Sequence, residues 1–343
     1  MTRKRINLAL QGGGAHGAFT WGVLDRILED DRLEIAAITG TSAGALNGAA
    51  LKSGLVQGGA DCARKKLDWL WGEIGGSDQS HLHSWMQGVT PRSVSQAVEN
   101  SPYYQTLDIL SRMSSPYSLG LLYTHPLRSV VEQLNFDEVC AKEGPDLFIC
   151  ATNVRSGKIR IFGREDTDTD AILASGCLPT IFQAVEIYDP KTERIEAYWD
   201  GGYMGNPALF PLFEPEFPAD VLIVKINPLH RENLPRKATE IQNRINEISF
   251  NGSLLRELRA IQFVRELIAS GKVKRGTMKD VLVHMVADNA LMNELSVATK
   301  TIPTPYILHE LKTAGRRAAD TFLDTHFDDL GERSTVDLRA MFG

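Results

Sequence analysis

The sequence predicts an α/β protein with three layers, in which a mostly parallel central sheet lies between helices on both faces. Short apolar runs that indicate buried strands alternate with longer segments in which apolar residues recur every three or four positions, as in helices. The first two apolar runs both end in glycines that precede a helical pattern. Because strands that alternate with helices are typical of parallel sheets covered on both sides, we expect an α/β/α arrangement.

The first predicted unit is a strand, a glycine-rich loop and a helix. Residues 6–11 form the apolar run of the strand, and residues 15–29 carry apolar side chains at helical spacing. A second strand is expected at 35–39, and a tight turn at 40–44 follows it. The next helix, predicted for 42–52, is rich in alanine and can therefore pack closely against a sheet.

Periodicity and turn residues predict the remaining elements. Residues 75–123 are rich in Gly, Ser, Pro, Trp and Tyr, which favours an insertion with short helices and without regular strands. Helices are expected at 58–74, 93–99, 106–113, 126–134, 239–269 and 305–323, and strands at 147–153, 158–162, 196–199, 221–226 and 281–286.

A single domain over residues 1–343 fits better than two, since no internal repeat or low-complexity linker divides the chain. Its core is expected at about 6–226, with the insertion at about 75–123 and a helical C-terminal part at about 236–330. Apolar residues of the insertion suit a lid or acyl-chain groove, or equally a small satellite core. They are Trp85, Met86, Tyr103, Tyr104, Met113, Tyr117, Leu121 and Leu122.

The composition argues against several classes of protein. The 343 residues are 43% apolar and 23% charged, as in ordinary globular proteins, and the net charge of −6 gives no support for nucleic-acid binding. Neither a signal peptide nor a transmembrane helix is visible. Four cysteines lie far apart without a C-x-x-C pair, so we expect reduced thiols in a cytoplasmic protein.

Two further patterns contain metal-ligating residue types. Asp166, Asp168 and Asp170 alternate as in a calcium loop, but the central glycine and the closing glutamate are missing. Helix capping is therefore the expected role. His81 and His83 have no cluster of carboxylates or cysteines to complete a metal site. We expect neither a metal nor any other cofactor.

Three consecutive glycines, Gly12, Gly13 and Gly14, follow the first predicted strand. With Gly17 they match a dinucleotide-binding loop, but no carboxylate ends the second strand to hold a ribose, and no P-loop lysine follows. The exposed N–H groups of such a loop, at the start of a helix, favour negative charge. That charge can belong to a phosphate or to an oxyanion formed during a reaction.

A second motif follows the second predicted strand. Gly40 and Gly44 flank Ser42 in a G-x-S-x-G pentapeptide. The glycines let a strand turn sharply into a helix, which leaves the serine exposed at the turn. The motif therefore predicts a nucleophilic serine, whereas the simpler interpretation is a serine that caps the helix.

A nucleophilic serine needs a group that accepts its proton. Asp200 ends a predicted strand and precedes Gly201 and Gly202, which would let another backbone or a substrate approach closely. A hairpin turn also explains an Asp-Gly pair. His230 and His284 lie near the ends of predicted strands and would instead complete a Ser-His-Asp triad.

These motifs, and their order along the chain, resemble those of the patatin-like phospholipases. That family has a glycine-rich loop after the first strand, a G-x-S-x-G serine after the second, and an Asp-Gly-Gly or Asp-Gly-Ala motif well downstream. Residues 174–179 and 206–207 are also similar to family segments. The resemblance covers roughly residues 6–226, and it implies a three-layer α/β/α fold.

The resemblance further implies a lipid acyl hydrolase that cleaves carboxylic ester bonds in a phospholipid, lysophospholipid or acylglycerol. Ser42 and Asp200 would form a catalytic dyad without histidine, and the glycine loop at residues 12–14 would form the oxyanion hole. Transient contact with a membrane surface is an expectation of the same kind. The alternatives are a Ser-His-Asp carboxylesterase and a non-catalytic lipid- or nucleotide-binding protein.

One residue departs from the family pattern. His16 stands where the family usually has Arg or Lys, so a group with a pKa of about 6.5 replaces a fixed positive charge beside the glycine loop. We therefore expect a neutral ester to suit the site as well as an anionic phosphoryl headgroup.

Overall fold

The computed structural model describes residues 3–75, 89–232, 234–236 and 238–342. Within these ranges, eight strands form one sheet in the order β5-β6-β3-β2-β1-β7-β8, and β4 also pairs with β3. The parallel strands are β1 (Lys4–Leu10), β2 (Leu33–Thr41), β3 (Asp146–Asn153), β7 (Asp220–Val224) and β8 (Leu282–Val286). The antiparallel pairings involve β4 (Ile159–Phe162), β5 (Val185–Asp189) and β6 (Arg194–Asp200).

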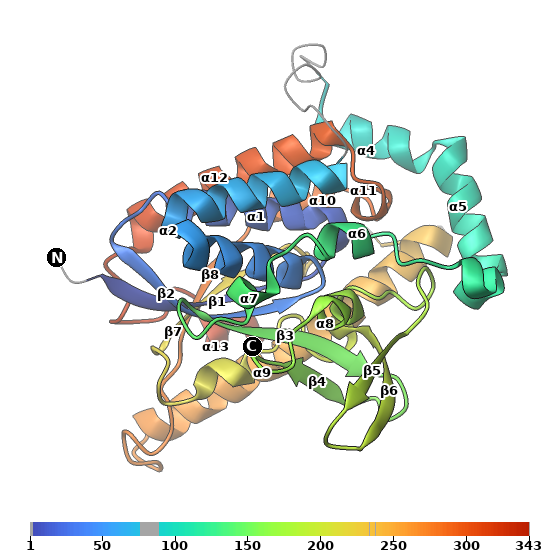
Figure 1. Cartoon of the computed structure of the whole chain (residues 1–343). Helices are drawn as coiled ribbons and strands as arrows, with labels where there is room; N and C mark the ends of the chain where they lie inside the picture. The colour runs from blue at the N-terminus through green and yellow to red at the C-terminus, as the bar shows by residue number, and fades with distance from the viewer. Residues whose placement is uncertain (1–2, 76–88, 233, 237, 343) are drawn as a thin grey trace.

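Helices cover both faces of the sheet, as Figure 1 shows. One face packs against α1 (Ala18–Ile27), α2 (Ala43–Gly75) and α12 (Pro305–His326). The other packs against α9 (Ala238–Ala269) and α13 (Leu338–Phe342). The three-layer α/β/α arrangement predicted from the sequence is confirmed.

The apolar core lies on both sides of the sheet because successive strand residues face opposite layers. In β7, Leu222 and Val224 contribute to the core on the α1 side, whereas Val221 and Ile223 contribute to the core on the α9 side. A strand buried on both faces must be apolar throughout, which is why such strands appear as continuous apolar runs in the sequence.

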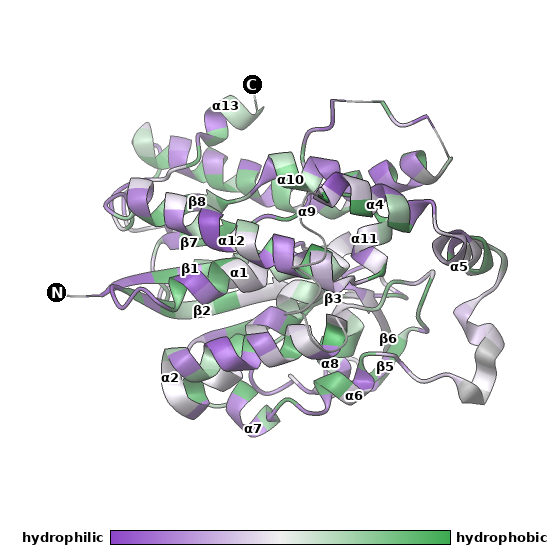
Figure 2. Ribbon diagram, turned by 90° about the horizontal axis from the view of Figure 1, so that it is seen from above, coloured by the Kyte–Doolittle hydropathy of each residue, from purple (hydrophilic) through white to green (hydrophobic). Residues whose placement is uncertain are grey.

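Glycines allow α1 and α12 to cross at close range on the first face. A Cβ atom at Gly22 would overlap the carbonyl oxygen of Lys312, and one at Gly315 would overlap that of Phe19. Figure 2 shows these helices from above, with hydrophilic and hydrophobic residues alternating along α2 and α12. Along α12, Leu311 and Phe322 are buried whereas Thr313 and Arg317 are exposed, and α1 is buried on nearly all sides.

The other elements are short and connect the layers. The described part of the chain contains no helix with the length and apolar character that crossing a membrane requires. The short elements are η1 (Gly14–Gly17), α4 (Pro91–Glu99), α5 (Pro102–Met113), η2 (Pro116–Leu122), α6 (Arg128–Val131), α7 (Phe136–Val139), α8 (Thr169–Ser175), η3 (Gly201–Tyr203), η4 (Phe210–Phe213), α10 (Asn289–Glu294) and α11 (Ala298–Thr301).

Helix α2 and the N-terminal cap of α8 agree with the sequence-based predictions, whereas β5 does not. The two helices predicted at 42–52 and 58–74 are the two arms of α2, which is kinked at Gly58 and Gly59. Asp168 accepts the N–H of Ala171 at 2.8 Å and so caps α8, as predicted. Strand β5 was not predicted from the sequence, because its side chains are mostly half-buried or exposed.

The insertion contains the expected short helices α4 and α5. Its apolar residues differ in exposure: Tyr104 is buried, whereas Tyr103, Met113 and Tyr117 are 67%, 82% and 58% exposed. Four residues named in the sequence analysis lie outside the described ranges, namely His81, His83, Trp85 and Met86.

Candidate functional site

Strands β2 and β6 meet end to end along one edge of β3. Thr41, the last residue of β2, pairs with Cys150, and Asp200, the last residue of β6, pairs with Ala151. Strand β4 pairs with residues 149–152 along the opposite edge of β3. Strand β6 therefore pairs with β3 on the same edge as β2, directly beyond the point where β2 ends. The ends of two strands far apart in sequence are thereby brought to adjacent residues of β3.

Ser42 forms the turn between β2 and α2. Its φ of 55° lies in the left-handed region, which non-glycine residues rarely adopt. Both flanking glycines are needed for this turn, since a Cβ atom at Gly40 would lie 2.5 Å from the Gly44 carbonyl oxygen, and one at Gly44 would overlap the Leu10 carbonyl oxygen. The Ser42 N–H donates to Ser175 Oγ at 2.8 Å, which fixes the turn against α8.

The Asp200 carboxylate lies at the same point and is 1% exposed. Burial raises the pKa of Asp200 to about 7, although hydrogen bonds from the Gly202 N–H and the Ser42 side chain act in the opposite direction. The Gly202 N–H donates to Asp200 Oδ1 at 2.7 Å. The structure therefore brings Ser42 and Asp200 together, and a carboxylate with this pKa can accept a hydroxyl proton near neutral pH.

Three glycines, Gly176, Gly201 and Gly202, lie close to this pair. A Cβ atom at Gly201 would overlap the Cys150 carbonyl oxygen, and one at Gly202 would lie 2.8 Å from the Phe250 ring. A Cβ atom at Gly176 would lie 3.7 Å from Ser42 Oγ, in ordinary van der Waals contact. Gly201 and Gly202 are thus required by close packing, whereas Gly176 leaves room beside the hydroxyl.

The glycine loop lies directly against the serine. A Cβ atom at Gly12 would lie 2.7 Å from Ser42 Cβ. The Gly12 N–H already donates to Asn206 Oδ1 at 2.7 Å, so it is not free to bind an oxyanion. The N–H groups of Gly13 and Gly14 belong to the N-cap and the first residue of η1, positions whose N–H groups have no partner within a helix.

The two triad candidates lie elsewhere. His284 is buried in β8, where Nε2 lies 2.9 Å from Asp220 Oδ1 and Nδ1 lies 3.2 Å from Thr335 Oγ1. In the sheet, β8 is separated from β2 by β1 and β7, which corresponds to about 14 Å at ordinary strand spacing. His230 is exposed, and its Nε2 lies 3.1 Å from Glu232 Oε1. Neither histidine joins the Ser42–Asp200 pair.

His16 is 1% exposed and lies in the packing between η1 and α11. Its Nε2 lies 2.8 Å from Thr299 Oγ1, and that hydroxyl donates to the Ser296 carbonyl, so the ring nitrogen is the donor. Burial, with the positive charges of Lys300 and Arg231, lowers the pKa of His16 well below its usual value. His16 is therefore neutral.

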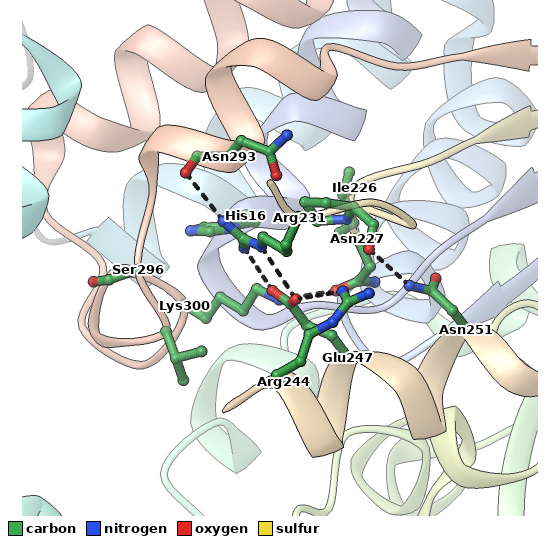
Figure 3. A network of polar contacts seen from close by, with 12 residues as sticks. His16, Ile226, Asn227, Arg231, Arg244, Glu247, Asn251, Asn293, Ser296 and Lys300 are labelled. Carbon is green, nitrogen blue, oxygen red and sulfur yellow. Dashed lines mark hydrogen bonds and ion pairs between the residues drawn. The ribbon is translucent and has the colours of Figure 1, made fainter. Parts of the chain in front are cut away.

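Positively charged side chains from distant parts of the chain lie near the glycine loop. Figure 3 shows Arg231, Arg244 and Lys300 converging on Glu247. The Arg231 guanidinium lies 2.6 Å from Glu247 Oε1, and Lys300 Nζ lies 3.9 Å from the same oxygen. Lys300 Nζ also donates to Asn227 Oδ1 at 2.9 Å.

Sequence reasoning missed most of these polar residues. Gln11, whose Oε1 accepts the Asn227 N–H at 3.0 Å, is a further member of this polar group. Gln11 and Asn227 follow the carboxyl ends of the parallel strands β1 and β7, the edge where ligands bind in open α/β sheets. That rule could have identified both. Lys300 has no such signal, because only the folded chain places α11 beside the glycine loop.

The family model described as patatin-like phospholipase matches residues 8–213, which include the glycine loop, Ser42 and Asp200. No curated protein matches the chain in sequence.

Among solved structures, VipD from Legionella pneumophila is 14% identical with a TM-score of 0.43, over 94% of this chain and 67% of that chain. ExoU in its heterodimeric complex with SpcU, from the type III secretion system of Pseudomonas aeruginosa, is 16% identical with a TM-score of 0.36. That match covers 95% of this chain and 52% of the other. The chain thus spans about half the length of the ExoU chain.

Proposed function

Because the chain belongs to the patatin-like phospholipase family, a family of lipid hydrolases, we propose that it cleaves carboxylic esters of lipids with Ser42 as nucleophile and Asp200 as base. The substrate is a phospholipid, a lysophospholipid or an acylglycerol. The observation that carries this proposal is the interaction of the Ser42 side chain with the buried Asp200 carboxylate. The pKa of about 7 supports it, since an unperturbed aspartate, with a pKa of about 3.9, is a poor base for an alcohol.

In the proposed acylation step, the Ser42 oxygen bonds to the ester carbonyl carbon while its proton passes to Asp200. The carbonyl oxygen becomes negatively charged, and the N–H groups of Gly13 and Gly14 are the donors that stabilise it. One such donor is worth about 3 kcal/mol in the transition state. The carbonyl then re-forms, and the alcohol leaves with the proton from Asp200.

In the proposed deacylation step, water replaces the alcohol. Asp200 takes a proton from the water as its oxygen bonds to the acyl carbon, and the same N–H groups bind the second oxyanion. Collapse breaks the bond to Ser42 Oγ, which recovers its proton from Asp200. The products are a free carboxylic acid and the original enzyme.

A fluorophosphonate probe tests the nucleophile, because only an activated serine reacts with it. We expect labelling of the wild type and of His230→Ala, and none of Ser42→Ala. Labelling that persists in Ser42→Ala contradicts the proposal. Loss of labelling in a folded His230→Ala variant would favour the triad, and an unlabelled wild type would favour a non-catalytic binding protein.

A panel of substrates then defines the ester class. Neutral p-nitrophenyl esters, acylglycerols and phospholipids are compared for the wild type and Ser42→Ala. Since His16 is buried and neutral, we expect neutral esters to be cleaved at least as well as phospholipids. A strict requirement for a phosphoryl headgroup would contradict this expectation.

Transient contact with lipid surfaces in the cytoplasm is part of the same proposal. Exposed apolar side chains on α5 support it, since Tyr103 and Leu110 are 67% and 53% exposed. Sedimentation with phosphatidylcholine vesicles tests it. We expect binding that Leu110→Asp weakens, and equal binding by the wild type and this variant contradicts the contact.

A further inference from the structure

A largely buried ammonium group lies close to the glycine loop. Lys300 belongs to α11, and its side chain is only 15% exposed. Its Nζ donates to Asn227 Oδ1 at 2.9 Å and lies 3.9 Å from Glu247 Oε1. Glu247 is also held by Arg231 at 2.6 Å and by Arg244 at 3.2 Å, so the charges around the ammonium are fixed in place.

The ammonium determines how the Asn227 side chain is oriented. An ammonium group only donates hydrogen bonds, so the amide oxygen of Asn227 must face Lys300. The amide nitrogen then faces the glycine loop and donates to the Gly12 carbonyl oxygen at 2.7 Å. Asn227 is 1% exposed, so water does not compete readily for either contact.

The Gly12 carbonyl belongs to the same peptide unit as the Gly13 N–H. A peptide unit is planar, and in the trans form its carbonyl and N–H point in opposite directions. The Gly12 carbonyl oxygen accepts hydrogen bonds from the Asn227 amide at 2.7 Å and from the Asn206 amide at 3.3 Å, so these amides, and the Asn227 amide most closely, fix the direction of the Gly13 N–H. Polarisation passes along the same path, because hydrogen bonds in series strengthen one another in a buried environment.

A second contact of α11 restrains the next residue of the loop. A Cβ atom at Gly14 would overlap the Lys300 carbonyl oxygen, so the backbone of α11 lies directly against Gly14. Lys300 thus supports the loop with its backbone and with its charge. Because α11 and the glycine loop are far apart along the chain, no local sequence motif predicts this contact.

We propose that Lys300 is a positioning residue that orients and polarises the Gly13 N–H through the Asn227 amide. This inference rests on the proposed function, in which the Gly13 N–H binds the oxyanion. Lys300 does not touch the reacting atoms. Its removal should therefore weaken the stabilisation of the transition state more than the binding of the substrate.

The pH dependence of the ammonium gives a specific signature. Burial lowers the pKa of Lys300 to about 8, with Arg231 acting in the same direction and Glu247 in the opposite one. The other groups that face it are Arg244, which is ion-paired to Glu247, and the neutral His16. The ammonium is lost as pH rises through this value, so kcat should decline on the alkaline side.

The experiment compares Lys300→Met with a matched variant, Lys52→Met. Lys52 is also a buried lysine, and its Nζ donates to a backbone carbonyl, that of Ala141, at 2.9 Å. With a neutral p-nitrophenyl ester, we expect Lys300→Met to lower kcat roughly tenfold, to change KM little, and to abolish the alkaline decline. We expect Lys52→Met to lower thermal stability and to leave the shape of the pH profile intact. An unchanged kcat in Lys300→Met, or an alkaline decline that persists there, overturns the inference.

An amide resonance measures the same coupling without catalysis. In protein labelled with ¹⁵N-glycine, the Gly13 signal is assigned by its absence from Gly13→Ala. We expect this signal to titrate near pH 8 in the wild type and to be shifted, without titrating, in Lys300→Met. Hydrolysis of the ester by Ser42→Ala at the wild-type rate would contradict the proposed function, in which Ser42 is the nucleophile. The Gly13 resonance would still test whether Lys300 orients the Gly13 N–H. A Gly13 signal that is the same in both proteins at every pH overturns the inference.

Discussion

The Ser42 side chain meets the Asp200 carboxylate because β2 and β6 end at adjacent residues of β3. Strand β3 thus acts as a common template for two strands that approach it from opposite directions. The resulting pair is enclosed by the sheet, the glycine loop and α8. Enclosure raises the pKa of Asp200 to about 7, and a buried carboxylate that ionises near neutral pH opposes folding.

Replacement of Asp200 with asparagine should remove activity and increase stability above neutral pH. The folded state retains the Asp200 proton up to about pH 7, whereas the unfolded chain releases it near pH 4. Stability contributed by the protonated carboxyl is therefore lost as pH rises from about 4 to about 7. Asparagine has no proton to lose, so Asp200→Asn should gain on the order of 1–4 kcal/mol over the wild type at pH 8.

Urea unfolding at pH 5 and pH 8 measures this difference, and hydrolysis of a p-nitrophenyl ester measures activity. We expect the stability advantage of Asp200→Asn to shrink at pH 5 and kcat/KM to fall by roughly a thousandfold or more. An Asp200→Asn variant that is less stable than the wild type at pH 8 would show that its ionised carboxylate favours the fold.

The pH profile of the wild type should follow the same carboxylate. A protonated Asp200 cannot accept the Ser42 proton, so kcat/KM for a neutral ester should rise with pH up to about 7. Well below that value the slope should approach about tenfold per pH unit. His230→Ala is the control, since it removes the most exposed candidate base and should keep the same profile. An acidic midpoint near pH 4 would indicate a carboxylate that is not perturbed by burial.

The sequence indicates Ser42 and Asp200 individually because each residue lies in a motif that encodes its own local geometry, and their pairing is implied by the resemblance to the patatin-like phospholipases. The left-handed φ of 55° at Ser42 requires small neighbours, and Gly40 and Gly44 make this turn recognisable in the sequence. The glycine beside Asp200 likewise records the close approach of the Cys150 carbonyl. Local conformational demands of this kind leave a trace that can be recognised in one sequence.

Contacts between distant segments left no such trace. The resemblance implies that the Gly12 N–H binds an oxyanion, but this N–H donates to Asn206 Oδ1 at 2.7 Å. The glycine motif contains no signal for that partner. The role of Lys300 depends on Asn227 and Glu247, which come from two other parts of the chain. Strand β5 was missed because an edge strand with half-exposed side chains lacks a clear apolar pattern.

Space beside the serine should be required for turnover and not for folding. A Cβ atom at Gly176 would lie 3.7 Å from Ser42 Oγ, and the φ of −103° suits alanine. Gly176→Ala should therefore fold normally while it crowds the ester as the tetrahedral intermediate forms. We expect kcat/KM to fall about tenfold or more, since small misplacements of reacting groups are costly. The control is Gly163→Ala, whose added methyl group meets no atom within 4 Å. Equal activity of both variants, measured with the same ester, would mean that the substrate approaches from another side.

Two glycines of α2 should respond to alanine with opposite signs. A Cβ atom at Gly44 would overlap the Leu10 carbonyl oxygen, so Gly44→Ala must push the first turn of α2 away from β1. Overpacking of this kind costs about 1–3 kcal/mol and would displace Ser42 as well.

At Gly72, in the second arm of the same helix, an added Cβ atom meets nothing within 4 Å. Alanine favours a helix over glycine by about 1 kcal/mol, so Gly72→Ala should stabilise the protein and leave activity unchanged. Thermal unfolding and ester hydrolysis of the two variants separate local strain from helix propensity, and a stable, active Gly44→Ala would contradict the tight turn on which the position of the serine depends.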